Sequence, residues 1–304
     1  MDDKPIFCSF VFPGYETNPL LFAESVRCFG GAFSNTTMWM MTPDFGKPLS
    51  AYAVKRLNEL SVQVIPFQVK REELRFFFYG ELAGLAQAET QAASETDSLI
   101  WMDANTILVN EPDDLILPKG KSFAYRPVHL LILGPRWETP LDPFWNLIYR
   151  DCGVPADRVF RMQPVAETIQ MRPYFNAGLL VLRPQYGLLR LWNEQFQQAS
   201  RSEEYQRLFQ QDNRYEIFLH QALLTGVALS HFSPDELVEL PPTYNYPVHL
   251  FERDMTGHRP GAMDELVTFR HECFYKEANW KSNFPASDEL KKWLESQLAK
   301  IPAG

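Results

Sequence analysis

The sequence has few cysteines, no surplus of positive charge and no long apolar run, and each shortage excludes a class of protein. Only 4 of its 304 residues are cysteines, and none stands in a CxxC or CxxH pair, so neither a disulfide framework nor a zinc site is indicated. Lysine and arginine number 29 against 38 acidic residues, which gives a net charge of −9. We therefore expect no nucleic-acid partner and no broad contact with an anionic membrane.

The apolar runs are all shorter than a membrane span. No segment approaches the roughly 20 apolar residues that a transmembrane helix needs, and the chain starts acidic, with no basic region and apolar stretch of a leader. We expect no transmembrane segment and a cytoplasmic protein with free thiols. Hydrophobic residues make up 45% of the chain and charged residues 22%, which is typical of a large globular core.

Short apolar runs alternate with stretches of helical periodicity in the first third of the chain. The pattern predicts strands at 6–12, 36–42, 62–67 and 98–102, with helices at 19–29, 48–60 and 79–93 between them. We expect Asn18-Pro19 to begin the first helix as its cap. Strands that are apolar on both faces and separated by helices form parallel sheets covered on both sides. The expected class is therefore α/β, with a Rossmann-like, mostly parallel sheet and a ligand at its strand ends.

The pattern after residue 120 is mixed. Further strands are predicted at 123–125, 178–182 and 267–269, and further helices at 142–151 and 188–199. A last helix begins after Ser287, which is a capping residue followed by two acidic residues and an apolar stripe. Two proline-rich stretches, 126–143 and 241–260, are expected to be functional loops or lids. We find no internal repeat or flexible linker and expect one domain over residues 1–304.

The segment 98–112 says most about function. An apolar strand ends at Asp103-Ala104-Asn105, which places two oxygen-bearing side chains two residues apart at the carboxyl end of the predicted sheet. Such a pair can ligate a divalent cation that bridges the diphosphate of a sugar nucleotide and supplies positive charge in an acidic protein. The alternative is structural, with Asp103 capping a turn and Asn105 in a left-handed position.

Residues 101–112, WMDANTILVNEP, resemble the region around the Asp-x-Asp motif of the glycogenin-like and lipopolysaccharide galactosyltransferase-like glycosyltransferases. Residues 174–184, YFNAGLLVLRP, are similar to that family's Phe-Asn-Ala-Gly strand, and His220-Gln221 to its Asp-Gln segment. The resemblance implies a GT-A fold and transfer of a sugar from a nucleotide-diphospho-sugar, with retention, to an unknown sugar, lipid or protein acceptor. It assigns residues 1–120 to nucleotide binding and residues 121–280 to the sugar and acceptor, and leaves 281–304 as a C-terminal helix.

The resemblance also implies roles for particular residues. It places Gln221 and Asn176 at the reacting sugar, and it implies Mn²⁺ or Mg²⁺ bound by Asp103, Asn105 and His271. The positions that it implies for substrate binding are Tyr15 (at the base), Arg75, Ala177, Gly178, His220 and Lys276 (at the diphosphate).

Two positions depart from the family's pattern. Asn105 stands where the family has its second Asp, and His220 stands where the family often has an acid, so metal affinity should fall. Three alternatives follow: weak metal binding, cationic side chains in place of the metal, or a non-catalytic nucleotide- or glycan-binding protein on the same fold. The candidates for such cationic side chains are Arg71, Arg75, Arg136 and Arg270.

Other chemistries have little support. The motifs GxGxxG, GxxxxGK[ST], HExxH and GxSxG are all missing, and Glu16, Glu167 and Glu272 are isolated glutamates with weak claims as general bases. A third hypothesis is a nucleotidyltransferase on a related sheet. Residues 12–20 contain a single glycine where its glycine-rich loop would fall, which counts against it.

Overall fold

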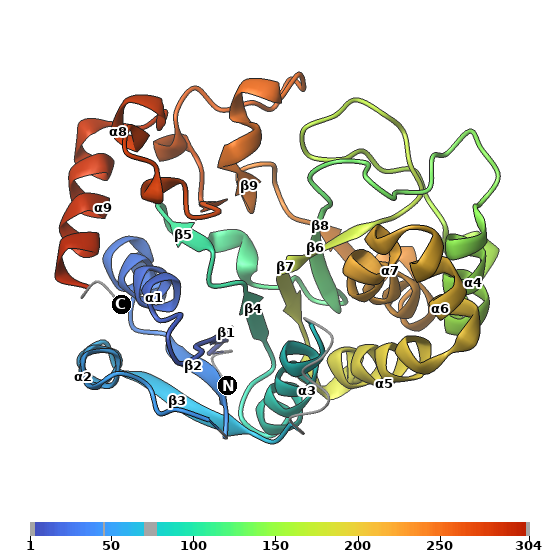
Figure 1. The fold of residues 1–304 in the computed structure, drawn as a ribbon, viewed down its shortest axis with the longest axis horizontal. Helices are drawn as coiled ribbons and strands as arrows, with labels where there is room; N and C mark the ends of the chain where they lie inside the picture. The colour runs from blue at the N-terminus through green and yellow to red at the C-terminus, as the bar shows by residue number, and fades with distance from the viewer. Residues whose placement is uncertain (1–3, 45, 70–77, 302–304) are drawn as a thin grey trace.

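A seven-stranded mixed sheet forms the centre of the molecule (Figure 1). The structure is a computed structural model, and it describes residues 4–44, 46–69 and 78–301. The strands of this sheet are β1 (Ile6–Phe10), β2 (Thr37–Pro43), β3 (Val62–Phe67), β4 (Leu99–Met102), β6 (Phe123–Pro127), β7 (Phe175–Leu182) and β8 (Leu237–Glu239). They lie in the order β3-β2-β1-β4-β7-β6-β8, and all run parallel except β7, which is antiparallel to both neighbours. The predicted α/β class with a mostly parallel sheet is confirmed.

Helices cover both faces of the sheet. One face carries α3 (Tyr79–Ala92), α4 (Pro143–Cys152), α5 (Leu188–Arg201), α6 (Glu203–Gln211) and α7 (Asn213–His231). The other face carries α1 (Thr17–Phe29) and α2 (Ala51–Glu59). Successive strand residues point to opposite faces of the sheet. Cys8 is therefore buried on the face covered by α3 to α7, and Phe7 on the face covered by α1 and α2.

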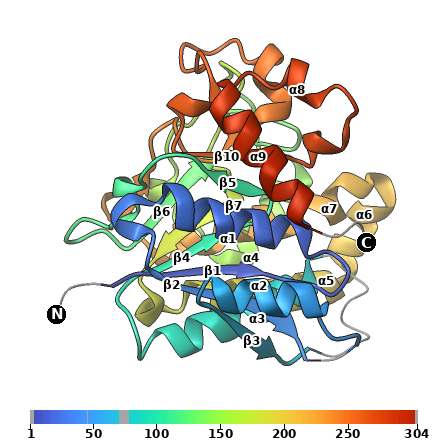
Figure 2. The same cartoon turned by 90° about the vertical axis from the view of Figure 1, so that its left-hand side faces the viewer.

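Three short strands form a second sheet. They are β5 (Thr106–Leu108), β10 (Thr268–Arg270) and β9 (Tyr246–Pro247), in the order β5-β10-β9. Helices α8 (Trp280–Asn283) and α9 (Asp288–Lys300) share a core with this sheet, and α9 also packs on α1 (Figure 2). Because β5 follows β4 after three residues, the second sheet brings β10 to the carboxyl end of the central one.

The first helix begins differently from the prediction. It starts at Thr17, and Asn18 lies inside its first turn instead of capping it. The amide Nδ2 of Asn18 donates a hydrogen bond to Oδ1 of Asn105, 2.7 Å away. The Asn-Pro pair is a local signal for a helix start, but a contact 87 residues away in the chain uses this side chain. The predicted cap at Ser287, in contrast, is confirmed, since its hydroxyl accepts from the Leu290 amide at 3.2 Å.

Helices α6, α7 and the short α8 were not predicted. Helix α7 is buried on all sides from Leu219 to Leu229, so it has no polar face and shows no amphipathic period. Helix α6 precedes it and packs on the same core. The stretch 241–260, predicted to be a loop, contains β9 and a 3₁₀ segment at Val248–Arg253 that lines the cavity described below.

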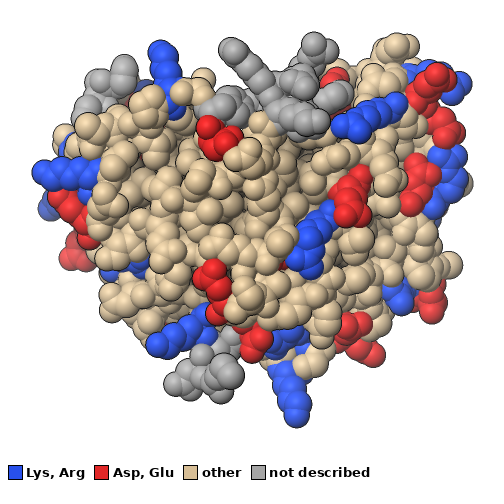
Figure 3. Space-filling model, turned by 90° about the horizontal axis from the view of Figure 1, so that it is seen from below, with Lys and Arg blue, Asp and Glu red and all other residues tan. Residues whose placement is uncertain are grey.

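Acidic and basic side chains are interspersed over the face shown in Figure 3, within a largely uncharged surface. Within the described part of the chain, no helix combines the length and the apolar character needed to cross a membrane.

Candidate active site

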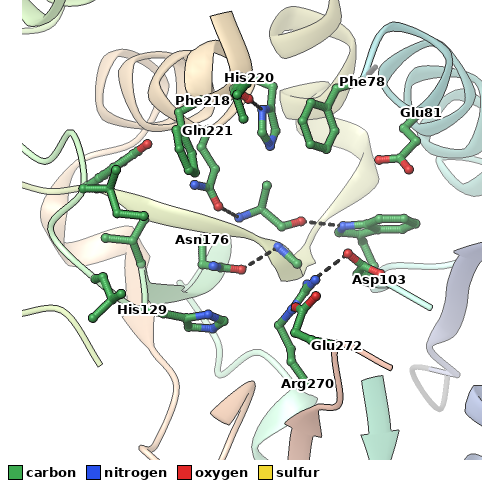
Figure 4. A pocket seen from close by; sticks show the side chains of 18 of the residues that line it. Phe78, Glu81, Asp103, His129, Asn176, Phe218, His220, Gln221, Arg270 and Glu272 are labelled. Atoms are coloured by element: carbon green, nitrogen blue, oxygen red, sulfur yellow. Dashed lines mark hydrogen bonds and ion pairs between the residues drawn. The ribbon is translucent and has the colours of Figure 1, made fainter. Parts of the chain in front are cut away.

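A cavity of about 250 Å³ lies at the carboxyl end of β4, where β7 passes beneath α3 and α7 (Figure 4). A second, smaller hollow of about 120 Å³ adjoins it and shares Glu81, Trp101 and Asp103 with the first. The strand-end position agrees with the rule that ligands of α/β sheets bind at the carboxyl ends of parallel strands. The polar residues lining the larger cavity are Glu81, Asp103, His129, Asn176, His220, Gln221, His249, Arg270 and Glu272.

Asp103 and Arg270 form an ion pair at the junction of the two hollows. Oδ2 of Asp103 lies 2.9 Å from Nη1 of Arg270, and Nε of Arg270 donates to Oε1 of Glu272 at 2.9 Å. Burial alone would lower the pKa of Arg270, but the charges of the two carboxylates outweigh it and the pKa is raised. Arg270 is therefore a permanent cation in the wall of the cavity.

The turn after β10 aims these groups. Glu272 and Cys273 follow each other in the left-handed region, with φ of 43° and 57°, which costs on the order of 1–3 kcal/mol for a residue other than glycine. This turn returns the carboxylate of Glu272 to Arg270 and the amide of Cys273 to Nδ1 of His271, 3.0 Å away. The strained turn thus allows both the contact between Glu272 and Arg270 and the contact between the Cys273 amide and His271.

The guanidinium of Arg270 lies directly against Gly178 of β7. A Cβ added at Gly178 would overlap Nη1 of Arg270 and would come within 2.9 Å of Oδ1 of Asn176. A side chain at the glycine of the Phe-Asn-Ala-Gly segment would therefore displace the guanidinium of Arg270.

Side chains from three elements hold the Asn176 to Gly178 segment of β7. Oε1 of Gln221 accepts from the Ala177 amide at 3.0 Å, and Nε1 of Trp101 donates to the Ala177 carbonyl at 2.7 Å. Oδ1 of Asn176 accepts from the Gly178 amide at 2.8 Å and from Asn245 Nδ2 at 3.0 Å. The predicted residues Asn176, Ala177, Gly178 and Gln221 thus come together in one wall.

His220 is a neutral group in the opposite wall. Its ring stacks on Phe78 with centroids 3.5 Å apart, and its Nδ1 lies 3.0 Å from the carbonyl of Ile217. Burial lowers the pKa of His220 to about 3, so the ring is uncharged at neutral pH. Because a carbonyl only accepts, the ring proton lies on Nδ1 and Nε2 keeps a free lone pair.

Glu81 was missed by the sequence analysis. It lies in the first turn of α3, and burial, followed by the charge of Asp103, raises the pKa of Glu81 to about 8, with Arg270 acting in the opposite direction. The cavity therefore contains a carboxylic acid that is mostly protonated at pH 7. The only signal in the sequence is one acidic residue in a helix segment of small and apolar residues.

Each of the three predicted metal ligands is engaged by another group of the protein. Oδ2 of Asp103 is paired with Arg270, and Oδ1 of Asn105 accepts from Asn18. His271 is fully buried, and its Nδ1 accepts from the Cys273 amide. A neutral ring whose Nδ1 accepts carries its proton on Nε2, and a protonated ring nitrogen has no lone pair for a metal. As arranged, these residues do not fit Mn²⁺ or Mg²⁺.

The remaining predicted residues have varied positions. Tyr15 is 80% exposed at the rim of the smaller hollow, which Asn18 and Asn105 also line. Lys276 is exposed, and no described residue pairs with it. Arg75, like Arg71, lies outside the described residues.

Residues 11–231 match the model of the Rhodobacterales glycosyltransferase domain. The fold and this match define a glycosyltransferase of the GT-A type. The chain belongs to the Rhodobacterales glycosyltransferase family. No curated protein matches it in sequence. Among solved structures, galactosyltransferase LgtC in complex with donor and acceptor sugar analogs is similar with a TM-score of 0.54 and 12% identity, over 98% of this chain and 97% of that chain.

Proposed function

We propose that the chain transfers a sugar from a nucleotide-diphospho-sugar to an acceptor hydroxyl, with retention at the anomeric carbon. The observation that carries the proposal is the pair of adjoining hollows at the end of β4, which meet at Asp103. The smaller hollow, with Tyr15 at its rim, suits the nucleoside. The larger cavity suits the donor sugar and the group that receives it, and their junction then takes the diphosphate.

The larger cavity has the character of a sugar site. Apolar walls from Trp192 and Leu130 alternate with a few hydrogen-bonding groups, as is typical of small-molecule sites. At neutral pH the groups facing the sugar are mostly uncharged, because Glu81 is mostly protonated and His220 is neutral. Uncharged donors and acceptors suit the hydroxyls of a sugar. Gln221 and Asn176 hydrogen-bond to the backbone of β7, which lines the cavity. Their role in transfer is therefore to position the donor sugar.

A thermal-shift titration tests this proposal. The purified chain is titrated with UDP, GDP, ADP and CDP and with their common sugar conjugates, each in EDTA and in Mn²⁺. A ligand at one hundred times its Kd stabilises a protein by about 2.7 kcal/mol, which gives a clear rise in Tm. We expect one nucleotide to raise the Tm, and the matching nucleotide-sugar to be hydrolysed slowly in the absence of an acceptor. A chain that responds to no nucleotide in either condition would contradict the proposal.

The alternative is a non-catalytic protein on the same fold that binds a nucleotide or a glycan. The hydrogen bond from Asn18 to Oδ1 of Asn105 favours it, because one lone pair of that oxygen is already engaged within the protein. Hydrolysis of a nucleotide-sugar by the wild-type chain, with no hydrolysis by an Asn176→Ala variant, would eliminate this alternative. The donor, the acceptor and the cytoplasmic location stay predictions.

A further inference from the structure

The site needs a cation if a diphosphate binds at the junction of the two hollows. The chain carries a net charge of −9, so long-range attraction does not supply it. Among the described residues that line the larger cavity, Arg270 is the only lysine or arginine. Burial, the largest cause in each case, lowers the pKa of His129, His220 and His249, so these three rings are neutral. Among the described residues that line either hollow, the positive charge is therefore the guanidinium of Arg270.

One edge of this guanidinium is available to an anion. Nη1 is directed at Asp103, while Nε donates to Glu272 and Nη2 has no acceptor among the described residues. The Nε and Nη2 atoms of an arginine form a fork that matches two oxygens of a phosphate. Glu272 accepts from Nε, one of the two atoms of this fork. Its side chain is 39% exposed, so it can rotate toward the solvent when an anion replaces it.

Asp103 and Gly178 fix the guanidinium in this position. The Asp103 side chain orients Nη1 from the end of β4, and the absence of a side chain at Gly178 leaves the space in which Nη1 lies. An aspartate bound in this way is a ligand of the arginine and not of a metal ion. This agrees with the buried ring of His271, whose only free nitrogen is protonated, and with the amide at position 105.

We propose that Arg270 binds the diphosphate of the donor in place of a divalent metal, with Glu272 displaced by a phosphate and Asp103 holding the guanidinium. The proposal rests on the proposed function, because it assumes a nucleotide donor in this cavity. It makes Arg270 a substrate-binding residue that bears the leaving group's charge during transfer.

Isothermal titration calorimetry tests the proposal on the full chain. The probe is whichever of UDP, GDP, ADP and CDP gives the largest thermal shift, titrated in EDTA and then in Mn²⁺. We expect a Kd in EDTA within about threefold of that in Mn²⁺, and a loss of at least about tenfold in Arg270→Gln, since a charge-assisted hydrogen bond is removed. Glu272→Gln should bind the probe more tightly than the wild type, because a neutral amide competes less with phosphate for Nε.

The matched control is Arg150→Gln. Arg150 also pairs with two carboxylates, Asp151 and Glu204, but it lies on the exposed end of α4 away from the cavity. Its variant should bind the probe as the wild type does. Circular dichroism and Tm show whether each variant folds. If Arg270→Gln does not fold, Gly178→Ala replaces it, since that variant keeps the charge and displaces the guanidinium.

Two results would overturn the proposal while leaving the proposed function intact. One is probe binding that disappears in EDTA and returns with Mn²⁺. The other is an unchanged Kd in both Arg270→Gln and Gly178→Ala. Weaker binding by Glu272→Gln would contradict the displacement of Glu272. Failure of every nucleotide to bind the wild-type chain in either condition would instead remove the proposed function, and this inference with it.

Discussion

The Nη1 atom of Arg270 fills the space that a side chain at Gly178 would need. These residues lie 92 positions apart, one in the central sheet and one in the small sheet. The contact therefore joins the two sheets at the cavity, and with Asp103 it connects the ends of β4 and β10 to the middle of β7.

Gly178→Ala should abolish most nucleotide binding and leave the fold intact. The added methyl group displaces the guanidinium, and overpacking of this kind costs about 1–3 kcal/mol of stability. We expect a fall of at least about tenfold in affinity, measured by calorimetry, with a cooperative thermal transition retained. Gly257→Ala is the control, because a Cβ at Gly257 meets nothing within 4 Å. Wild-type affinity in Gly178→Ala would show that the position of Arg270 does not matter.

Asn105→Asp should create a response to Mn²⁺ that the wild-type chain lacks. The change puts a second carboxylate beside Asp103, and like charges close together destabilise the fold unless a cation binds between them. We expect a lower Tm in EDTA that rises again with Mn²⁺. Asn58→Asp, at an exposed position of α2, adds the same charge elsewhere and should show no recovery. A variant that is equally stable in both buffers would contradict this prediction.

Stability should fall as the pH rises toward 8, and Glu81 should cause part of the fall. Burial raises the pKa of Glu81 to about 8 in the folded chain, whereas the pKa of a glutamate in the unfolded chain is near 4.5. Between these values the folded state holds the extra proton, so raising the pH favours unfolding by up to about 1.4 kcal/mol per pH unit. Glu89, whose pKa burial raises to about 7, acts in the same direction over part of this range.

Urea unfolding between about pH 5 and pH 8 measures this slope. Glu81→Gln removes the titrating group and should flatten the slope relative to the wild type. Glu194→Gln, at an exposed position of α5, should leave it as it is. An unchanged slope in Glu81→Gln would mean that the carboxyl of Glu81 is hydrated in the folded chain.

Gln221→Ala and Gln221→Glu should differ in stability. Alanine leaves the partly buried amide of Ala177 without its acceptor, which costs up to about 3 kcal/mol. Glutamate keeps an oxygen at that place, so more of the wild-type stability should remain. Tm and the rate of nucleotide-sugar hydrolysis, measured on both, separate the support of β7 from any direct part of the amide in transfer. Equal Tm values for the two variants would show that the bond to Ala177 contributes little.

The main sheet was predictable because its signal is local. Strands β1, β2 and β4 are apolar on both faces and alternate with helices, so each element is visible in a short window of sequence. Helix α7 was not visible, because burial on every side removes the period that reveals a helix. The cap assigned to Asn18 was wrong for the opposite reason, since a strong local signal gave way to a distant contact with Asn105.

In the candidate site, too, local motifs were predictable and contacts between distant residues were not. The motif positions Asp103, Asn176, Gly178 and Gln221 were found, and the structure brings them to one cavity. The sequence did not reveal the ion pair between Asp103 and Arg270. Arg270 was one of four candidate arginines, and no local feature of the sequence shows which of them contacts Asp103, 167 residues away in the chain. Glu81 was overlooked, since its chemistry comes from burial beside Asp103 and not from a motif.

If the guanidinium of Arg270 binds the diphosphate as proposed, an arginine of the chain itself takes the place of a metal cofactor. Each copy of the chain then has the positive charge that binds the diphosphate. Neither a chelator nor a shortage of manganese can remove this charge. Such a transferase would keep working through metal starvation, where a relative that depends on a free ion would stop.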